Sequence, residues 1–264
     1  MPGQHRPARR CDSRPMLRGV RLAVVSDVHG NLAALEAVVA DLRLTAPDLV
    51  LHGGDAAVMG SRPAEVVDRL GELAWPGLVG NTDEMLWRPE VRAEQERRAP
   101  KLRSWLEVLF GVLGPWAAER LGDERLAWLR SLPEERRAGD VRVVHASPGD
   151  LWRAPMPGAA DAELAATYGG QEEAVAVYGH VHRPYVRRLS GLTVANSGSA
   201  GLPWDGDPRA AYLLVDEGRP SVRRVAYDLE RAGRDLHEAG FPLAGWLETV
   251  QREGRFSRPE PESG

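Results

Sequence analysis

The 264-residue chain is predicted to fold as a mixed α/β protein. In roughly the first 80 residues, short apolar segments typical of buried strands alternate with segments of helical periodicity, which indicates βαβ units with mainly parallel strands. Beyond about residue 185, short strand-like segments are separated by turns rich in glycine, proline and aspartate, which favours antiparallel strands. Because the chain has no internal repeat and no obvious linker, we expect a single domain over residues 20–252.

The first half of the chain supplies the βαβ units. An apolar run over residues 20–25 predicts a buried strand, and apolar residues on one face of residues 32–42 predict a helix with Asn31 as its N-cap. The alternation continues with a strand, a helix and a strand end over residues 49–51, 63–73 and 78–79.

The second half is expected to add helices and an antiparallel segment. Residues 84–139 combine dense charge with apolar residues at helical spacing, so two or three helices are predicted to cover one side of the core. Strands are predicted over residues 141–144, 174–178, 185–189, 192–195, 212–215 and 222–227. Closing helices are predicted over residues 229–239 and 243–252.

Composition excludes several classes of protein. The single cysteine excludes an intrachain disulfide and any cysteine-rich metal site, and it agrees with a cytoplasmic location. The formal net charge of −4 and the lack of a long apolar run predict neither binding to a nucleic-acid polymer nor a membrane partner. Residues 1–19 are expected to be a disordered basic extension and residues 253–264 a flexible tail.

Potential metal ligands stand where the predicted strands end. Because open α/β sheets bind ligands beyond the carboxyl ends of their strands, we expect these side chains to meet. Imidazole and carboxylate together suit Mn, Fe, Zn or Ni better than Ca or Mg. Two divalent ions about 3.5–4 Å apart need a shared anionic ligand, and Asp55 suits that bridge. The predicted metal ligands are Asp27, His29, Asp55, Asn81, His145, His180 and His182.

Six motifs in order resemble the calcineurin-like metallophosphoesterase superfamily, and most of all its small single-domain bacterial and archaeal phosphodiesterases. The motifs are DVHGN, GGD, GNTD, VHASP, GHVHRP and NSGS. The resemblance implies a four-layer αββα sandwich of two mixed sheets flanked by helices. It also implies that three ligands hold the first ion, three hold the second and one holds both: Asp27, His29 and His182; Asn81, His145 and His180; and Asp55.

The activity implied by the resemblance is metal-dependent hydrolysis of a phosphoester, in which a hydroxide held between two ions attacks phosphorus. Asp55, Asn81 and His145 are the expected catalytic residues. A small phosphorylated molecule or nucleotide is the expected substrate, with manganese among the candidate metals and a homodimer as one open oligomeric state. A phosphodiesterase is favoured, and a phosphatase or a dinucleoside polyphosphate hydrolase is the alternative. A nuclease would need a basic groove, and a protein-binding scaffold would not need the seven ligands.

Thr82 departs from the family pattern. Many members have a histidine there that assists the leaving group, and such general acid catalysis is typically worth about 10²–10⁴ in rate. Its absence is expected to favour substrates with good leaving groups. His52, beside the second metal motif, is one conceivable substitute donor, and a structural role is the alternative.

Several residues are predicted to contact the substrate or support the ligands. Asn31 suits a helix cap and a partner of the metal ligands equally well. Arg153 and Arg183 follow metal motifs and are candidate phosphate partners, with a solvated position as the alternative. Asn196, in the NSGS turn, is expected to support the structure or to touch the substrate. Trp204 stands where the family usually has arginine, which is expected to alter contact with the substrate.

Overall fold

Strand β1 (Leu22–Val25) is buried on both of its faces in the computed structural model, which describes residues 20–170 and 173–259. Because successive side chains point to opposite faces of a strand, Leu22 and Val24 face one layer while Ala23 and Val25 face another. A strand of this kind needs apolar cover on both sides, so β1 lies inside a layered structure.

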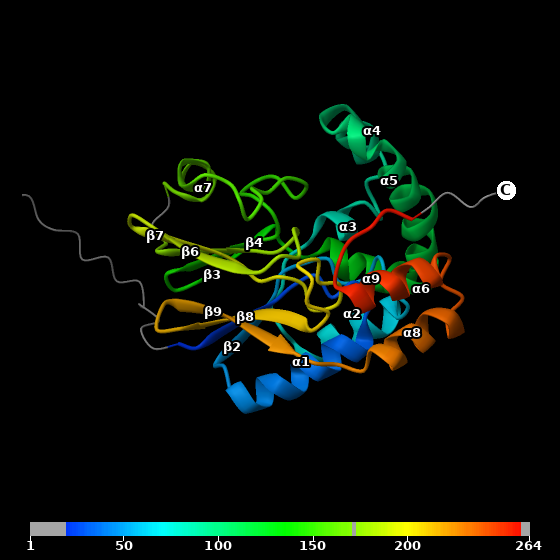
Figure 1. The fold of residues 1–264 in the computed structure, drawn as a ribbon, viewed down its shortest axis with the longest axis horizontal. Coiled ribbons are helices and arrows are strands. Elements are labelled where there is room, and N and C mark those ends of the chain that lie inside the picture. The colour runs from blue at the N-terminus through cyan, green and yellow to red at the C-terminus, as the bar shows by residue number, and fades with distance from the viewer. Residues whose placement is uncertain (1–19, 171–172, 260–264) are drawn as a thin grey trace, which may run out of the picture.

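Two mixed sheets form the centre of the protein (Figure 1). The first has the order β2-β1-β8-β9, in which β1 pairs parallel with β2 and antiparallel with β8. The second has the order β3-β4-β5-β7-β6, with parallel pairing from β4 to β7 and antiparallel strands at both edges. The other strands are β2 (Leu49–His52), β3 (Glu135–Ala138), β4 (Val141–Val144), β5 (Val175–Tyr178), β6 (Tyr185–Leu189), β7 (Leu192–Asn196), β8 (Ala210–Asp216) and β9 (Arg219–Val225).

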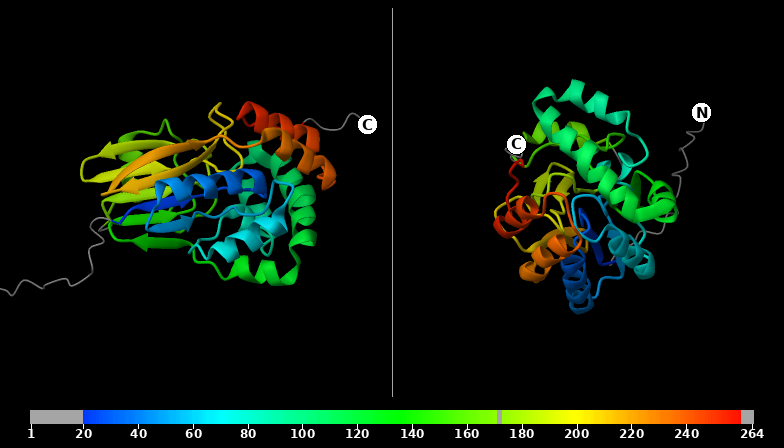
Figure 2. Two further views of the ribbon diagram at one scale, coloured as in Figure 1. Left: turned by 90° about the horizontal axis from the view of Figure 1, so that it is seen from below. Right: turned by 90° about the vertical axis from the view of Figure 1, so that its right-hand side faces the viewer.

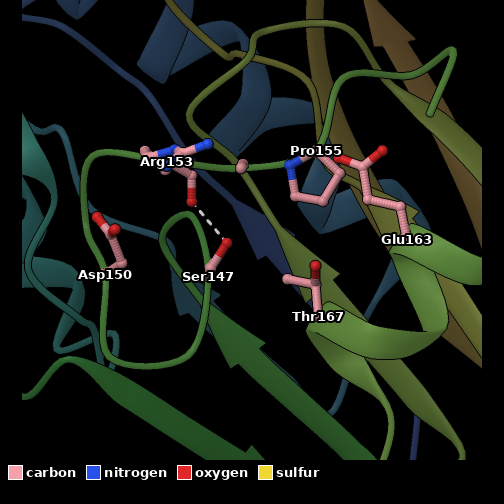
Figure 3. A pocket seen from close by; sticks show the side chains of 7 residues that line it. Ser147, Asp150, Arg153, Pro155, Glu163 and Thr167 are labelled. Carbon is pink, nitrogen blue, oxygen red and sulfur yellow. Dashed lines mark hydrogen bonds between the residues drawn. The ribbon is translucent and has the colours of Figure 1, made fainter. Parts of the chain in front are cut away.

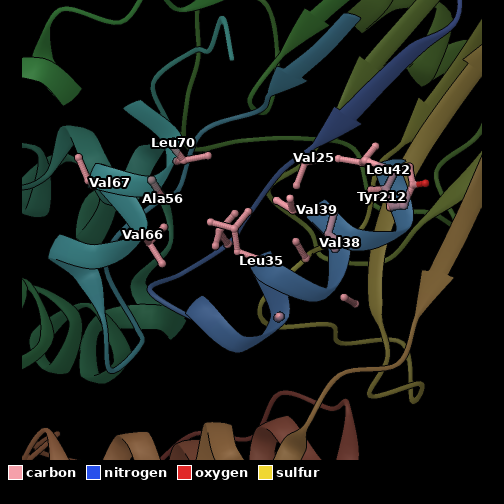
Figure 4. Close-up of a cluster of buried hydrophobic side chains, with 14 of the residues drawn as sticks. Val25, Leu35, Val38, Val39, Leu42, Ala56, Val66, Val67, Leu70 and Tyr212 are labelled. Atoms are coloured by element: carbon pink, nitrogen blue, oxygen red, sulfur yellow. The ribbon is translucent and has the colours of Figure 1, made fainter. Parts of the chain in front are cut away.

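Apolar side chains of the two sheets pack against each other, and a helix covers each outer face. Helix α1 (Leu32–Thr45) places Leu35, Val38 and Val39 against the outer face of the first sheet (Figure 4). Helix α7 (Asp161–Tyr168) covers the second sheet with Leu164 and Tyr168. The predicted αββα sandwich of two mixed sheets is confirmed.

Most of the other helices gather beyond the end of the sandwich at which β1 stops (Figure 2). No helix among the described residues has the length and apolar character that crossing a membrane requires. The remaining helices are α2 (Pro63–Leu73), α3 (Asn81–Glu84), α4 (Val91–Arg98), the 3-10 helix η1 (Pro100–Leu102), α5 (Arg103–Val108), the π-helix η2 (Leu109–Leu113), α6 (Gly114–Arg130), α8 (Leu229–Glu238) and α9 (Ala244–Glu253).

Three elements differ from the prediction. Residues 78–79 form no strand, because Leu78 and Val79 donate their backbone hydrogen bonds to different segments, at His52 and Pro133. Strand β3 was missed because its charged sequence lies at a sheet edge and shows no apolar alternation. Helix α7 was missed because it buries only two side chains and therefore has a weak periodic pattern.

The chain after α9 packs against the protein as far as it is described, which differs from the expected flexible tail. The ring of Phe256 contacts the rings of Trp105, Trp204 and Trp246, and the indole N–H of Trp246 donates to the carbonyl of Ser257 over 2.8 Å. Aromatic burial therefore holds this segment in place. The predicted basic extension over residues 1–19 and the last five residues of the tail lie outside the described residues.

Candidate metal centre

Six of the seven predicted ligands lie in turns that follow the strands, and Asn81 begins helix α3. Left-handed backbone is uncommon for residues other than glycine, and each instance costs on the order of 1–3 kcal/mol unless its surroundings enforce it. Such strain clusters at functional sites, so this backbone geometry marks the turns as a candidate site independently of residue type. Five of the seven ligands have a positive φ of 50–63°: Asp27, His29, Asp55, His180 and His182.

The turns are held together by backbone hydrogen bonds and by Asp83. The N–H groups of Asp27 and His29 donate to the carbonyls of Gly54 and Asp55, both over 3.0 Å. The buried carboxylate of Asp83 accepts hydrogen bonds from the N–H groups of Asp55, Ala56 and Gly80 over 2.8–3.0 Å. Burial and the neighbouring Asp55 carboxylate raise the pKa of Asp83 to about 6.

The first group of donor atoms is buried and compact. Nε2 of His182 lies 3.1 Å from Nε2 of His29 and 3.2 Å from Oδ1 of Asp27. Oδ2 of Asp55 lies 3.7 Å from Nε2 of His29. Each of these four residues offers one atom within 4.8 Å of all the others, and transition-metal ligands at about 2.0–2.2 Å from one ion have such separations. The donor set therefore fits a transition-metal ion.

The second group lies on the other side of Asp55. Oδ1 of Asn81 is 2.9 Å from Nε2 of His145 and 2.8 Å from Nδ1 of His180. Nε2 of His145 is 3.5 Å from Oδ2 of Asp55. These atoms are an amide oxygen, two imidazole nitrogens and a carboxylate oxygen, and this set also fits a divalent transition metal.

The two oxygens of Asp55 face different partners. Oδ1 accepts a hydrogen bond from the N–H of Thr82 over 2.9 Å. Oδ2 faces both donor groups, since it is close to His29 and to His145. A Cβ at Gly80 would lie 2.0 Å from Oδ1, so glycine is needed for this close approach. Asp55 is thus positioned to share one oxygen between two cations.

Carbonyl groups orient three of the imidazoles. A carbonyl only accepts hydrogen bonds, so each facing Nδ1 carries a proton, and Nε2 is the nitrogen that is placed to bind a metal. His180 is the exception, because it turns Nδ1 toward the second group. The pairs are His29 with Val58 over 2.7 Å, His145 with Gly53 over 2.8 Å and His182 with Leu202 over 2.6 Å.

The charges of the site perturb one another strongly. Burial disfavours a charged imidazole at His145, but the carboxylates of Asp55 and Asp27 outweigh it and raise the pKa of His145 to about 10. Burial and the neighbouring His145 lower the pKa of His180 to about 4. The pKa of Asp55 lies well below its usual value despite burial, because of His145 and His29. Such displaced values are typical of functional sites.

Asn31 and Asn196 have structural contacts. Asn31 caps α1, because its Oδ1 accepts from the N–H of Ala34 over 3.1 Å, while its amide donates to the carbonyl of Gly201 over 2.9 Å. Asn196 is fully buried, and its side chain bonds to the carbonyl of Gly179 and to the N–H of Gly198. These contacts fit the supporting role, and contact of Asn196 with a substrate stays a prediction.

The two arginines are placed differently relative to the ligands. Arg153 lines a pocket of about 220 Å³ together with Ser147, Asp150 and Glu163 (Figure 3). None of the seven ligands lines this pocket. The exposed Arg183 donates from Nε to the carbonyl of Trp204 over 3.2 Å, on the loop that borders the first group. Substrate contact by either arginine stays a prediction.

His52 is not placed as a proton donor. Its ring is buried and stacks on Trp128 with 5.7 Å between ring centroids, and a Cβ at Gly77 would lie 1.6 Å from its Nε2. Burial and the nearby Arg136 lower its pKa to about 4, so the ring is neutral at pH 7. Neither ring nitrogen has a hydrogen-bond partner among the described residues. The structure therefore corrects the suggested donor role in favour of a packing role.

Comparison with known proteins identifies the family of the chain. Residues 20–218 match the calcineurin-like phosphoesterase superfamily domain. The chain is 27% identical over 249 residues to an uncharacterized protein of Methanocaldococcus jannaschii, a match that covers 86% of this chain and 95% of that protein.

Solved structures extend the comparison. A metallophosphoesterase from Sphaerobacter thermophilus is similar with a TM-score of 0.70 and 28% identity, over 89% of this chain and 99% of that chain. A hypothetical protein from Pyrococcus horikoshii shares the fold with a TM-score of 0.73 and 19% identity, over 90% of this chain and 100% of that chain. Because the family match spans most of the sequence and includes all seven ligands, the chain belongs to the calcineurin-like phosphoesterase superfamily.

Proposed function

We propose that this protein binds two divalent transition-metal ions and hydrolyses a phosphodiester bond in a small phosphorylated molecule or nucleotide. The observation that carries the proposal is the position of Asp55 Oδ2, which lies within 3.7 Å of one donor group and within 3.5 Å of the other. Two neighbouring cations repel each other, and a single carboxylate oxygen between two sets of imidazole ligands compensates that repulsion. A cytoplasmic location stays a prediction from the single cysteine.

The two ions would meet unequal surroundings. Asp27 adds a second carboxylate to the first group, whereas Asn81 gives the second group a neutral amide. The second group therefore leaves more positive charge uncompensated, which favours binding of a phosphoryl oxygen on that side. When bound, two such ions lower the pKa of a water molecule and neutralise charge on the phosphoryl oxygens.

The preference for a diester with a good leaving group rests on the missing proton donor. Thr82 is buried, and its hydroxyl oxygen is sealed from solvent. His52 is buried and packs against Trp128. Neither side chain is placed to protonate a leaving group, so a substrate whose leaving group departs as a stable anion is favoured.

Metal content and turnover test the proposal together. We expect the protein to take up two equivalents of Mn²⁺ by elemental analysis and to hydrolyse bis-p-nitrophenyl phosphate faster than p-nitrophenyl phosphate or a dinucleoside polyphosphate. Faster cleavage of either competitor would favour the phosphatase or polyphosphate hydrolase alternative. No metal uptake together with no hydrolysis would refute an enzyme and leave the protein-binding scaffold.

Thr82→Val is expected to leave hydrolysis unchanged and to stabilise the protein slightly. The hydroxyl of Thr82 has no hydrogen-bond partner among the described residues, and an unpaired buried hydroxyl costs roughly 1 kcal/mol or more. An increase of about 1 kcal/mol in the free energy of unfolding raises the unfolding temperature by about 2–4 °C in a protein of this size class. Differential scanning calorimetry and the bis-p-nitrophenyl phosphate assay measure the two effects. A loss of turnover of about 100-fold or more, on the order of one missing proton donor, would mean that the hydroxyl takes part in the reaction.

A further inference from the structure

Trp204 lies flat against one of the proposed metal ligands. The centroids of its ring and of the His182 imidazole are 3.8 Å apart, and the two planes are inclined by only 25°. The backbone N–H of Trp204 also donates to the carbonyl of His182 over 3.1 Å. The same residue thus contacts the side chain and the backbone of His182.

The loop that carries Trp204 restrains the imidazole in two directions. The carbonyl of Leu202, two residues earlier, accepts from Nδ1 of His182 over 2.6 Å. The hydrogen bond restrains the ring within its own plane, and the stacked indole blocks one of its faces. Nε2 is left pointing toward Oδ1 of Asp27 at 3.2 Å. Nε2 is therefore the part of the His182 ring that is left to bind the first ion.

Packing from the C-terminal segment keeps Trp204 in place. The indole N–H of Trp204 is buried and has no hydrogen-bond partner among the described residues, so no bond at Nε1 orients the ring. Instead, the ring of Phe256 contacts it with 4.8 Å between centroids, and Phe256 is itself packed against Trp105 at 5.2 Å. The N–H of Gly206 donates to the carbonyl of Gly254 over 2.8 Å, which ties the two segments together.

We propose that Trp204, supported by Phe256, is a positioning residue that holds His182 ready for the first metal ion. The inference rests on the proposed metal centre. An imidazole bound to a cation carries part of the positive charge, and the face of an indole attracts such a ring. The stack therefore favours the metal-bound state of His182 as well as its orientation. Groups that orient metal ligands typically change metal affinity by about 10–100-fold.

The test compares Trp204→Leu with Trp204→Phe, since both remove the indole and only the second keeps an aromatic face. Calorimetric titration of the metal-free full-length protein with Mn²⁺ measures the two affinities. His182→Ala and Asn81→Ala identify which binding phase belongs to which ion. We expect Trp204→Leu to weaken only the first-ion phase by about tenfold or more, the effect of a lost orienting partner. Trp204→Phe is expected to retain most of the affinity.

Two further variants control the experiment. Trp116 belongs to a separate aromatic pair with Phe241, so Trp116→Leu is expected to change neither phase. Phe256→Leu is expected to weaken the first phase alone, and it carries the test if circular dichroism shows that Trp204→Leu does not fold. Unchanged affinity in Trp204→Leu, or equal weakening of both phases, would overturn the positioning role. Absence of Mn²⁺ binding by the unmodified protein would instead refute the metal centre itself.

Discussion

Asp55→Asn is expected to lower kcat/KM for bis-p-nitrophenyl phosphate by at least about 10³-fold, which corresponds to about 4 kcal/mol of transition-state stabilisation. The substitution keeps the shape of the side chain, and its amide oxygen still accepts from the N–H of Thr82. It replaces Oδ2 with an NH₂ group, which donates hydrogen bonds and binds no cation. The imidazoles of His29 and His145 then face a donor instead of the shared anion.

Both ions are expected to be lost together in this variant. Elemental analysis after dialysis against Mn²⁺ should give far less than one equivalent for Asp55→Asn, whereas His182→Ala should mainly deplete one ion. Glu163→Gln removes an exposed carboxylate that is not a ligand, so this control is expected to retain both ions and full activity. Full activity or full metal content in Asp55→Asn would show that Asp55 is not the bridge.

The fold was largely predictable because buried strands leave a local signal. The run Val141–Val144 has the predicted bounds, since an apolar strand between turns needs no distant information. Edge strand β3 has charged residues at a solvated rim, and only its pairing with β4 reveals it. The contact of Phe256 with three tryptophans depends on segments that are distant in sequence, so no local sequence pattern predicts it.

The ligands of the candidate site were predictable for a different reason. All but Asn81 follow a strand end, and the carboxyl ends of neighbouring strands lie together, so residue type and position were sufficient to nominate them. Asn81 was nominated from a predicted strand end over residues 78–79 that does not form. Their orientation was not predictable. The carbonyls of Val58 and Leu202 that select the imidazole tautomers carry no signal in residue type. The different partners of the two Asp55 oxygens likewise depend on a backbone N–H supplied by Thr82 in helix α3.

Removal of metal with a chelator is expected to lower the unfolding temperature by about 8 °C or more. An ion that binds only the folded protein stabilises it by about 4 kcal/mol when its concentration is about 1,000 times the dissociation constant. For proteins of roughly this size, each kcal/mol shifts the unfolding temperature by about 2–4 °C. The ligands come from segments distant in sequence, so the unfolded chain offers no comparable site. Calorimetry with Mn²⁺ and with excess chelator measures the difference.

The difference between the unfolding temperatures of the metal-bound and the metal-free protein is expected to increase as pH rises from 6 to 8.5. In the metal-free protein the pKa of His145 is raised to about 10, above its unfolded value of about 6.5. Protonation of His145 therefore contributes stability that is fully present below about pH 6.5 and is lost as pH rises toward 10. A metal ion must displace this proton, so metal binding strengthens over the same pH range while the metal-free protein becomes less stable.

His237, which is exposed and pairs with Glu248, supplies the control variant His237→Gln, in which the increase of this difference with pH should persist. If the difference between the two unfolding temperatures stays constant with pH, His145 holds no proton for the metal to displace. The carboxylates of the metal-free site would then face a neutral imidazole.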